Sequence, residues 1–201
     1  MIVAIVLAAG MSQRMGKPKL LLKLNGDTII EHIIKELQQS NIDSVIVVLG
    51  HNPQPLIDLL SHYSVKTVIN KNYKEGMTSS FKVGLIEVKD VADAALLVLG
   101  DQPFISHHLI NKLIETYKKA SDAKIVSPIY KGKKGHPVLF DRTLFNEILS
   151  LPPDKYIREV IHNHYNELVT IPWDKGTILD IDTPEDYIEA LKYFKSQKKS
   201  E

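Results

Sequence analysis

Residues 1–19 constrain the fold of this chain more than any other stretch. Residues 2–7 are all apolar, and a short apolar run of this kind predicts a strand buried on both faces. The loop that follows contains two glycines and three cations: Gly10, Gly16, Arg14, Lys17 and Lys19. Backbone N–H groups in such a loop, with cations beside them, bind anions such as phosphate. Because open α/β folds bind nucleotides at the carboxyl ends of their strands, this stretch predicts a nucleotide site.

Two common phosphate-binding motifs do not match this loop. A P-loop has four residues between its glycines, followed by Lys and then Ser or Thr. Here five residues separate Gly10 from Gly16, and Lys17 is followed by Pro18. The dinucleotide fingerprint G-x-G-x-x-G also fails, because Ala8 and Met11 leave no second glycine near Gly10. A Rossmann-type oxidoreductase is therefore a weak alternative.

The composition excludes several classes of function. The 201 residues fit one α/β domain, which we place at residues 1–195, with a charged tail at 196–201. A formal net charge of +1 gives no reason to expect nucleic acid or an anionic membrane as a partner. The absence of cysteine excludes disulfides, thiolate metal sites and cysteine nucleophiles. Neither a membrane span of ~18 apolar residues nor a signal peptide is evident, so we expect a cytoplasmic protein.

Apolar periodicity predicts alternating helices and strands after the loop. Apolar residues recur at helical spacing between Ile29 and Leu37. Two β-branched runs follow at 44–49 and 65–69, with a short helix predicted at 53–60 between them. This order predicts a parallel sheet with helices on both faces, which is an α/β fold.

A carboxylate follows the most hydrophobic predicted strand, 94–99, which ends in Gly100-Asp101-Gln102-Pro103. An aspartate directly after a buried central strand lies at the ligand-binding edge of the sheet. Its hard oxygen atoms suit Mg²⁺, which is held by few protein carboxylates together with phosphate oxygens. The alternative is an aspartate that only forms a turn.

A second acidic pair stands near the carboxyl end of the chain. The stretch that begins at Ile178 reads as a short strand, whose alternation puts Asp180 and Asp182 on the same face. Thr183 and Pro184 then provide the N-cap and first position of a helix. The two aspartates either bind a ligand or only favour the positive end of that helix.

A polar stretch, 70–80, precedes another apolar helical pattern. Its hydroxyl groups either cap that helix or bind a phosphate or ribose at the helix start. Gly76, Ser79 and Ser80 are the candidate residues for the second role.

The loop from Leu7 to Lys19 resembles the opening loop of the MobA-like nucleotidyltransferase superfamily, L-A-A-G-x-S-x-R-M-G-x-x-K, at every fixed position. Ala8-Ala9-Gly10 with Ser12 is similar to the molybdenum cofactor cytidylyltransferase branch, because the guanylyltransferase branch usually carries Ala-Gly-Gly there. The resemblance implies a three-layer α/β/α fold with a mostly parallel, doubly wound, Rossmann-like sheet of the nucleotide-diphospho-sugar transferase type. It covers the chain from the first strand to the last helix.

The resemblance also implies roles for individual residues. Nucleotide binding is implied for Leu7, Ala8, Ala9, Gly10, Ser12, Arg14, Lys19, Gly76, Ser79, Ser80, Gly100 and Asp101. Catalytic roles are implied for Arg14, Lys19, Asp101 and Asp182, and Asp101 and Asp182 would hold Mg²⁺, with Asp182 favoured over Asp180. Binding of the second substrate is implied for Gln102, Pro103, Gly135, His136, Pro137 and Arg158.

The chain departs from the family pattern at residues 150–161. A Gly-Asp-x-Gly-x-Arg segment usually stands near this place, and here Asp154 and Arg158 fit it while Tyr156 occupies a usual glycine position. The way in which the second substrate is held is therefore the part of the resemblance with least support.

The predicted reaction is transfer of a nucleoside monophosphate, CMP from CTP, to the terminal phosphate of molybdopterin, with release of pyrophosphate. A phosphate nucleophile is already ionised at neutral pH, so the reaction requires charge neutralisation and alignment rather than a general base. The expected partners are the nucleoside triphosphate, the phosphorylated acceptor and a molybdoenzyme that receives the cofactor. Alternatives are another nucleotide or a sugar phosphate acceptor on the same fold, and a carrier that binds nucleotide or cofactor without catalysis.

Overall fold

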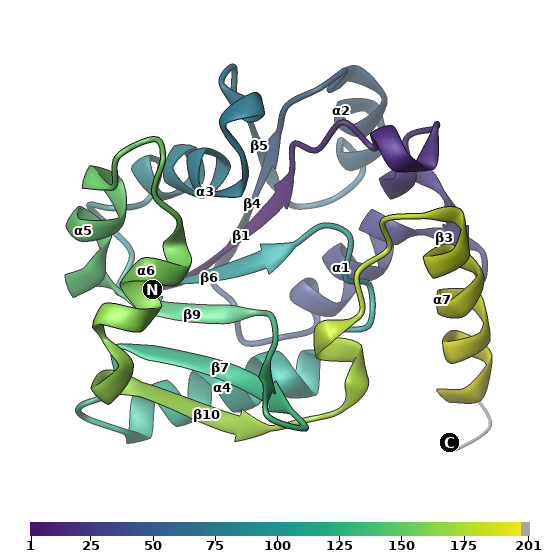
Figure 1. Ribbon diagram of the computed structural model, residues 1–201. Helices are drawn as coiled ribbons and strands as arrows, with labels where there is room; N and C mark the ends of the chain where they lie inside the picture. The colour runs from purple at the N-terminus through teal and green to yellow at the C-terminus, as the bar shows by residue number, and fades with distance from the viewer. Residues whose placement is uncertain (198–201) are drawn as a thin grey trace.

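The computed structural model describes residues 1–197. Four parallel strands form one half of its sheet: β1 (Ile2–Ala8), β4 (Ser44–Leu49), β5 (Lys66–Ile69) and β6 (Ala94–Leu99) (Figure 1). In β1, Val6 lies beside Val47 on one side and beside Val98 on the other, so both edges of this strand are paired. The buried apolar run at the start of the chain is thus a central strand, as its composition predicts.

The second half of the sheet has mixed directions. It contains β7 (Ile125–Tyr130), β8 (Lys133–Lys134), β9 (Val138–Asp141) and β10 (Leu168–Pro172). The strand order is β10-β7-β9-β6-β1-β4-β5, with β8 paired to β7. β9 is antiparallel to both β6 and β7, whereas β10 is parallel to β7 at the edge. A separate short hairpin consists of β2 (Lys23–Leu24) and β3 (Asp27–Thr28).

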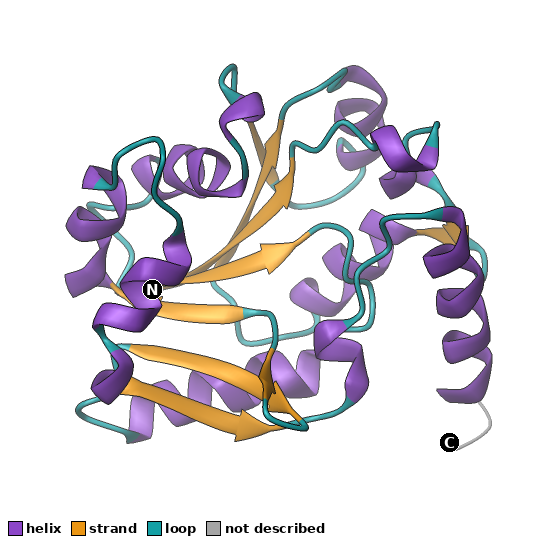
Figure 2. Ribbon diagram, viewed as in Figure 1, coloured by secondary structure: helices purple, strands orange, loops and turns teal. Residues whose placement is uncertain are grey.

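Helices cover both faces of the sheet (Figure 2). One layer contains α1 (Ile29–Gln38), α2 (Gln54–Leu60), α4 (His107–Lys119) and α7 (Pro184–Gln197). The opposite layer contains α3 (Met77–Ile86), α5 (Phe145–Ser150) and α6 (Ile157–Asn163). Alternate residues of β1 serve the two layers, because Ala4 and Val6 pack toward the first and Val3 and Ile5 toward the second. The fold is a three-layer α/β/α sandwich.

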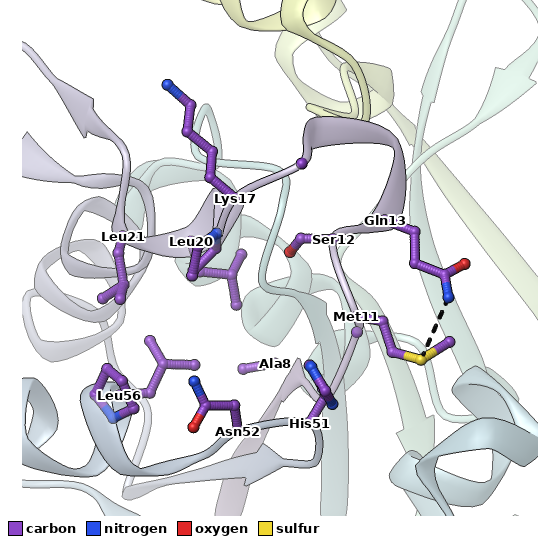
Figure 3. A pocket seen from close by; sticks show the side chains of 14 residues that line it. Ala8, Met11, Ser12, Gln13, Lys17, Leu20, Leu21, His51, Asn52 and Leu56 are labelled. Atoms are coloured by element: carbon purple, nitrogen blue, oxygen red, sulfur yellow. Dashed lines mark hydrogen bonds between the residues drawn. The ribbon is translucent and has the colours of Figure 1, made fainter.

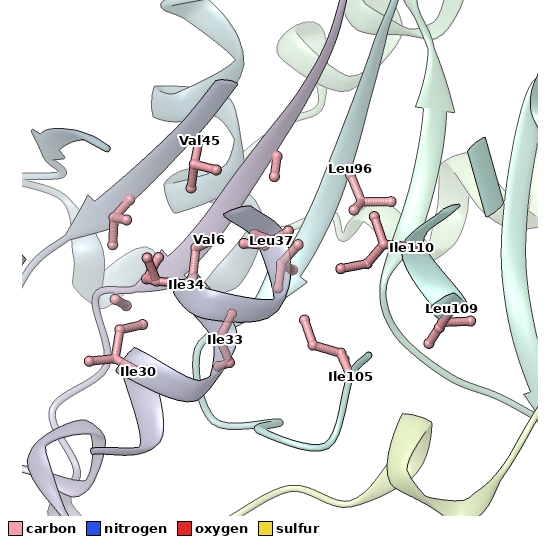
Figure 4. Packing of buried hydrophobic residues seen from close by; sticks show 14 of the residues in the cluster. Val6, Ile30, Ile33, Ile34, Leu37, Val45, Leu96, Ile105, Leu109 and Ile110 are labelled. Atoms are coloured by element: carbon pink, nitrogen blue, oxygen red, sulfur yellow. The ribbon is translucent and has the colours of Figure 1, made fainter. Parts of the chain in front are cut away.

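Helix α1 illustrates how the sequence pattern produces this packing. Its residues Ile30, Ile33, Ile34 and Leu37 face the sheet and are at most 1% exposed (Figure 4). Burial of each such side chain contributes about 1.5–3 kcal/mol. The helix begins at a capping box, in which the Thr28 hydroxyl accepts from the Glu31 N–H while the Glu31 carboxylate accepts from the Thr28 N–H.

Two local expectations are wrong. Residues 178–181 do not form a strand: a 3₁₀ turn at Lys175–Ile178 is followed by an irregular segment. The Ile181 N–H donates to the carbonyl oxygen of Asp101, which lies in a turn and not in a strand. The segment is therefore not paired as a strand here, and the alternation of side chains between two faces does not apply to Asp180 and Asp182. In addition, α3 has Gly76 rather than a hydroxyl residue as its N-cap.

Residues 198–201 of the expected charged tail lie outside the described residues. Within residues 1–197, none of the helices is long and apolar enough to cross a membrane.

Candidate active site

The loop between β1 and α1 leaves the carboxyl end of the central strand and turns back through two left-handed residues, Ser12 (φ 52°) and Gly16 (φ 66°). A 3₁₀ turn, Gln13–Met15, lies between them, and the buried Met15 side chain anchors it. The Lys19 N–H donates to Ser12 Oγ at 3.2 Å. The hydroxyl of Ser12 thus closes the loop and fixes the position of the Lys19 backbone.

Two glycines at this edge of the sheet have different physical reasons to be glycine. A Cβ at Gly100 would lie 2.6 Å from the carbonyl oxygen of Leu7, so close contact between β1 and the turn after β6 requires glycine there. A Cβ at Gly10 would meet no atom within 4 Å, and its φ lies outside the left-handed region. The fold therefore does not require glycine at position 10, and any requirement must come from something that binds next to it.

Three hollows surround the loop, and Gly10 lines all of them. The first, about 340 Å³, lies between the loop and the start of α2; Figure 3 shows Leu20, Leu21 and Leu56 on one side of it and Ser12 and His51 on the other. The second, about 240 Å³, is lined by Arg14, Lys19, Asp182 and residues 10–13. The third, about 250 Å³, is lined by the following residues: Leu7, Ala9, Gly10, Tyr73, Gly76, Met77, Ser80, Leu99 and Asp101.

Four charged side chains meet beside these hollows: Arg14, Lys19 and Asp182 line the second, and Asp101 lines the third. Lys19 Nζ lies 2.6 Å from Asp101 Oδ2 and 2.8 Å from Asp182 Oδ1. One guanidinium nitrogen of Arg14 lies 2.8 Å from Asp182 Oδ2. The Lys19 side chain is 11% exposed, whereas that of Arg14 is 68% exposed. Three segments that are distant in the sequence, around residues 14–19, 101 and 182, therefore form one cluster with two positive and two negative charges.

The cluster stabilises the charged forms of its members. Burial disfavours the ammonium of Lys19, but the carboxylates of Asp101 and Asp182 outweigh that effect and raise the pKa of Lys19. Burial likewise opposes ionisation of Asp182, but hydrogen bonds and charges from Lys19 and Arg14 lower the pKa of Asp182. At neutral pH Lys19 and Asp182 are therefore both charged.

The donor set fits a divalent cation held with the help of a substrate. The carboxylates of Asp101 and Asp182 both reach one ammonium nitrogen, so they can both reach one cation. Across residues 1–197, no cluster of three or more His, Cys, Asp or Glu side chains has the geometry of a metal site. Two carboxylates, with phosphate oxygens and water completing the ligand set, are typical of Mg²⁺ rather than of a closed structural site.

The polar stretch before α3 forms a buried network around Asn70. Asn70 is 2% exposed, and its Nδ2 donates to Ser79 Oγ at 2.9 Å and to Ser80 Oγ at 3.0 Å. Ser80 is 3% exposed, and Gly76 adopts φ 94°. Asn70 begins the polar stretch of the sequence motif but is not among the named candidate residues. It bonds both candidate serines, of which Ser80 lines the third hollow.

The predicted second-substrate residues do not form one group. Gln102 is 3% exposed and donates to Asp180, so its side chain supports a neighbouring segment; Pro103 is also buried. Arg158 stacks on Tyr156 and lines a separate hollow with Lys134 and His162, away from the four-charge cluster.

The motif Gly135-His136-Pro137 lies closer to the cluster. A Cβ at Gly135 would lie 2.4 Å from the carbonyl oxygen of Thr177, and the His136 N–H donates to that same oxygen at 2.9 Å. The His136–Pro137 peptide bond is cis. Burial lowers the pKa of His136 to about 4 despite the charge of Asp101, so its imidazole is neutral at neutral pH.

Comparison with known families connects this geometry with a class of enzyme. Residues 4–168 match the profile of the MobA-like NTP transferase domain. The chain belongs to this family. The matched span includes the loop after β1, the Asn70 network and Asp101, whereas Asp182 lies beyond it and reaches the cluster through the tertiary fold.

Three curated relatives match this MobA-like chain over nearly their whole lengths. The molybdenum cofactor cytidylyltransferase of Escherichia coli K12 is 29% identical over 193 residues, which is 94% of this chain and 95% of that protein. A probable molybdenum cofactor guanylyltransferase of Natranaerobius thermophilus is 26% identical, with coverage of 94% and 95%. Nicotine blue oxidoreductase of Paenarthrobacter nicotinovorans is 27% identical, with coverage of 94% and 96%. Two of these three relatives are nucleotidyltransferases by name.

A solved structure has the same architecture. Rv0371c of Mycobacterium tuberculosis H37Rv is 29% identical and superposes with a TM-score of 0.85 over 95% of this chain and 97% of that chain. The same protein has also been solved as a complex with manganese, which superposes with a TM-score of 0.81 at 27% identity and coverage of 95% and 98%. The MobA-like chain described here is therefore an α/β nucleotidyltransferase by family and fold.

Proposed function

We propose that this MobA-like protein transfers CMP from CTP to the terminal phosphate of molybdopterin and releases pyrophosphate. The observation that carries the proposal is the convergence of Lys19, Arg14, Asp101 and Asp182 beside Gly10, at the carboxyl end of the central parallel strands. Cations and carboxylates in one cluster suit a polyanionic substrate that arrives with a divalent metal ion.

Each side chain has a task in this reaction. An oxygen of the acceptor phosphate attacks the α-phosphorus, and the bond between that phosphorus and the oxygen bridging to the β-phosphate breaks. Lys19 and Arg14 hold the β- and γ-phosphates and neutralise the negative charge on the departing pyrophosphate. The backbone around Gly10 approaches the phosphates closely because no side chain intervenes. Since the nucleophile is already an anion, no residue needs to remove a proton from it.

Asp101 and Asp182 are the residues that would hold Mg²⁺. When bound, the cation would supply charge neutralisation between the two phosphate groups. For this to happen Lys19 must leave the carboxylates, which frees its ammonium for the phosphates. The manganese complex of Rv0371c supports a divalent cation in a protein of this fold.

The choice of CTP rests on two similarities. The loop carries Ala8-Ala9-Gly10, the pattern of the cytidylyltransferase branch, and the Escherichia coli relative is a cytidylyltransferase by name. The guanylyltransferase relative keeps GTP as the next candidate. The third hollow, with Tyr73, Gly76 and Ser80 opposite Leu7 and Ala9, is the place where we expect the base and ribose to bind.

An oxidoreductase is a second candidate because one relative, nicotine blue oxidoreductase, is similar over nearly the whole chain. The loop lacks the G-x-G-x-x-G fingerprint. Binding of NAD(P)H, together with hydride transfer to an acceptor, is the behaviour that would favour this candidate.

Thermal unfolding with CTP, GTP, UTP, ATP or NADPH, each with and without Mg²⁺, tests these alternatives. A ligand at about 100 times its Kd adds about 2.7 kcal/mol, which raises the Tm of a domain of this size by about 5–10 °C. We expect the largest Mg²⁺-dependent shift with CTP, followed by pyrophosphate release only when molybdopterin is present.

Asp101→Asn tests whether the protein catalyses the transfer. It should lower pyrophosphate release by about 10²–10³-fold, the usual cost of removing one group that stabilises transition-state charge. A carrier without catalysis would bind nucleotide but release no pyrophosphate in the wild type. A shift with GTP alone would retain the reaction and discard CTP, and a shift with NADPH alone would refute the nucleotidyl-transfer proposal.

A further inference from the structure

Three attachments hold the segment before α7 against the turn after β6. The Ile181 side chain is 1% exposed, and its N–H donates to the Asp101 carbonyl oxygen at 3.0 Å. Gln102 Nε2 donates to Asp180 Oδ1 at 2.6 Å. The two backbones are thus joined beside the positions that carry Asp101 and Asp182.

Gln102 is an unusual residue for the place that it occupies. It is 3% exposed, and its Oε1 is buried with no hydrogen-bond partner among the described residues. Burial of a half-satisfied amide costs free energy that an apolar side chain would avoid. Its remaining polar contact is the bond to the exposed residue Asp180, so the bond to Asp180 is the contribution that an apolar residue could not replace.

Asp180 and Asp182 have separate partners although they are two positions apart. Asp180 accepts from Gln102, whereas Asp182 accepts from Lys19 and pairs with Arg14. The backbone N–H of Asp182 donates to Asp186 Oδ2 at 3.1 Å, which connects this segment to the first turn of α7. The backbone that carries Asp182 is therefore attached on one side to α7 and on the other, through Asp180, to Gln102.

We propose that Gln102 and Asp180 form a positioning pair, which sets the orientation of the Asp182 carboxylate relative to Asp101 without touching a substrate or a metal ion. This inference rests on the proposed function of the Asp101–Asp182 site. Loss of the pair leaves the Ile181 attachments in place but allows the segment between Asp180 and Asp182 to shift. Misplacement of a catalytic group by about 1 Å costs up to about 10²-fold in rate.

Substitution of Asp180 by Ala and by Asn separates a positioning role from direct metal ligation. Asp180→Ala removes the acceptor, and we expect kcat to fall about 10-fold or more while KM for the nucleotide changes little. Asp180→Asn keeps an acceptor oxygen for Gln102 Nε2, so it should restore most of kcat. A metal ligand would instead lose as much activity in Asp180→Asn as in Asp180→Ala, because the carboxylate charge is removed in both.

A double-mutant cycle with Gln102→Leu tests the pair in two ways, by kcat in the complete reaction and by Tm in the absence of metal and substrate. Gln102→Leu keeps a similar volume and removes the donor, and its combination with Asp180→Ala should lower kcat, and Tm in EDTA, no further than the larger of the two single effects. Asp122→Ala, at an exposed loop, is the control and should change neither quantity.

Two results overturn the positioning role: Asp180→Asn as defective as Asp180→Ala, or additive losses in the double variant. Wild-type protein that releases no pyrophosphate would refute the proposed function instead, and the cycle of Tm values in EDTA would still test the pair.

Discussion

Substitution of Lys19 by Met removes an ammonium that touches both Asp101 and Asp182, while it retains most of the apolar length of the side chain. The Lys19 side chain is 11% exposed, so the free energy that these ion pairs contribute should lie between the values for exposed and for fully buried pairs. An exposed ion pair contributes up to about 1 kcal/mol, and breaking a fully buried pair costs about 3–5 kcal/mol. A cost of about 2 kcal/mol is therefore expected, and for this chain length it corresponds to a Tm lower by about 4–8 °C in EDTA.

The same substitution should strengthen metal binding in the absence of nucleotide. In the wild type a divalent cation must displace the ammonium from the two carboxylates, whereas in Lys19→Met nothing has to be displaced. If the ~2 kcal/mol lost on substitution no longer opposes the cation, the affinity for Mn²⁺ rises about 30-fold, because 1.36 kcal/mol corresponds to a factor of ten. Free Mn²⁺ measured by electron paramagnetic resonance gives the Kd directly, and Mn²⁺ should raise the Tm of the variant more than that of the wild type.

Lys17→Met is the matched control, because it changes the net charge equally on the same loop. Lys17 is exposed, and its ammonium points away from the adjacent hollow (Figure 3). It should change the affinity for Mn²⁺ by less than about threefold, as expected for a screened surface charge. The reasoning is refuted if Lys19→Met binds Mn²⁺ no more tightly than the wild type, or if Lys17→Met gains as much.

Two other predictions follow from single residues. In Gly10→Ala the added Cβ meets no atom within 4 Å and needs no left-handed φ, so the free energy of unfolding should equal that of the wild type or exceed it by up to about 1 kcal/mol. The affinity for CTP, measured by thermal-shift titration, should fall at least about tenfold. Unchanged affinity would mean that nothing binds against this glycine. His164 bonds Glu167 and Glu147, and these bonds outweigh partial burial and raise the pKa of His164 above its ordinary value. Its stabilisation is complete below the unfolded pKa of about 6.5 and is lost as pH rises through the higher folded pKa. Urea melts should therefore show the stability gap between wild type and His164→Ala narrowing as the pH rises above about 6.5; a gap that widens would contradict the assignment.

Several features of the protein follow from local sequence alone. The apolar run before Gly10 predicts a strand buried on both faces, which β1 is, and the spacing from Ile29 to Leu37 produces the buried stripe of α1. Thr28 caps that helix, and Thr183 directly precedes the last one, which begins at Pro184, because hydroxyl caps and a first-turn proline satisfy helix starts by local chemistry. The motif positions also identified the family, which residues 4–168 match.

Other features depend on which backbones meet, and local periodicity carries no information about that. The antiparallel insertion of β9 between β6 and β7 is one of them. The separation of Asp180 from Asp182 is another: both were expected on one face of a strand, yet the Asp101 carbonyl binds Ile181 and Gln102 binds Asp180. Alternation holds only where a ladder fixes the backbone as a strand, and here the partners are a turn and a buried amide.

The charged residues of the candidate site could be identified from the sequence, but their arrangement as one cluster could not. Arg14, Lys19, Asp101 and Asp182 each stand beside a recognisable motif, and nothing in their spacing says that one ammonium would touch both carboxylates. Strand order, and the way α7 packs beside the β2–β3 hairpin, bring them together. The sequence therefore determined which groups are available for chemistry, and the tertiary structure decided which of them are neighbours, because long-range contacts depend on the packing of the whole sheet and its helices.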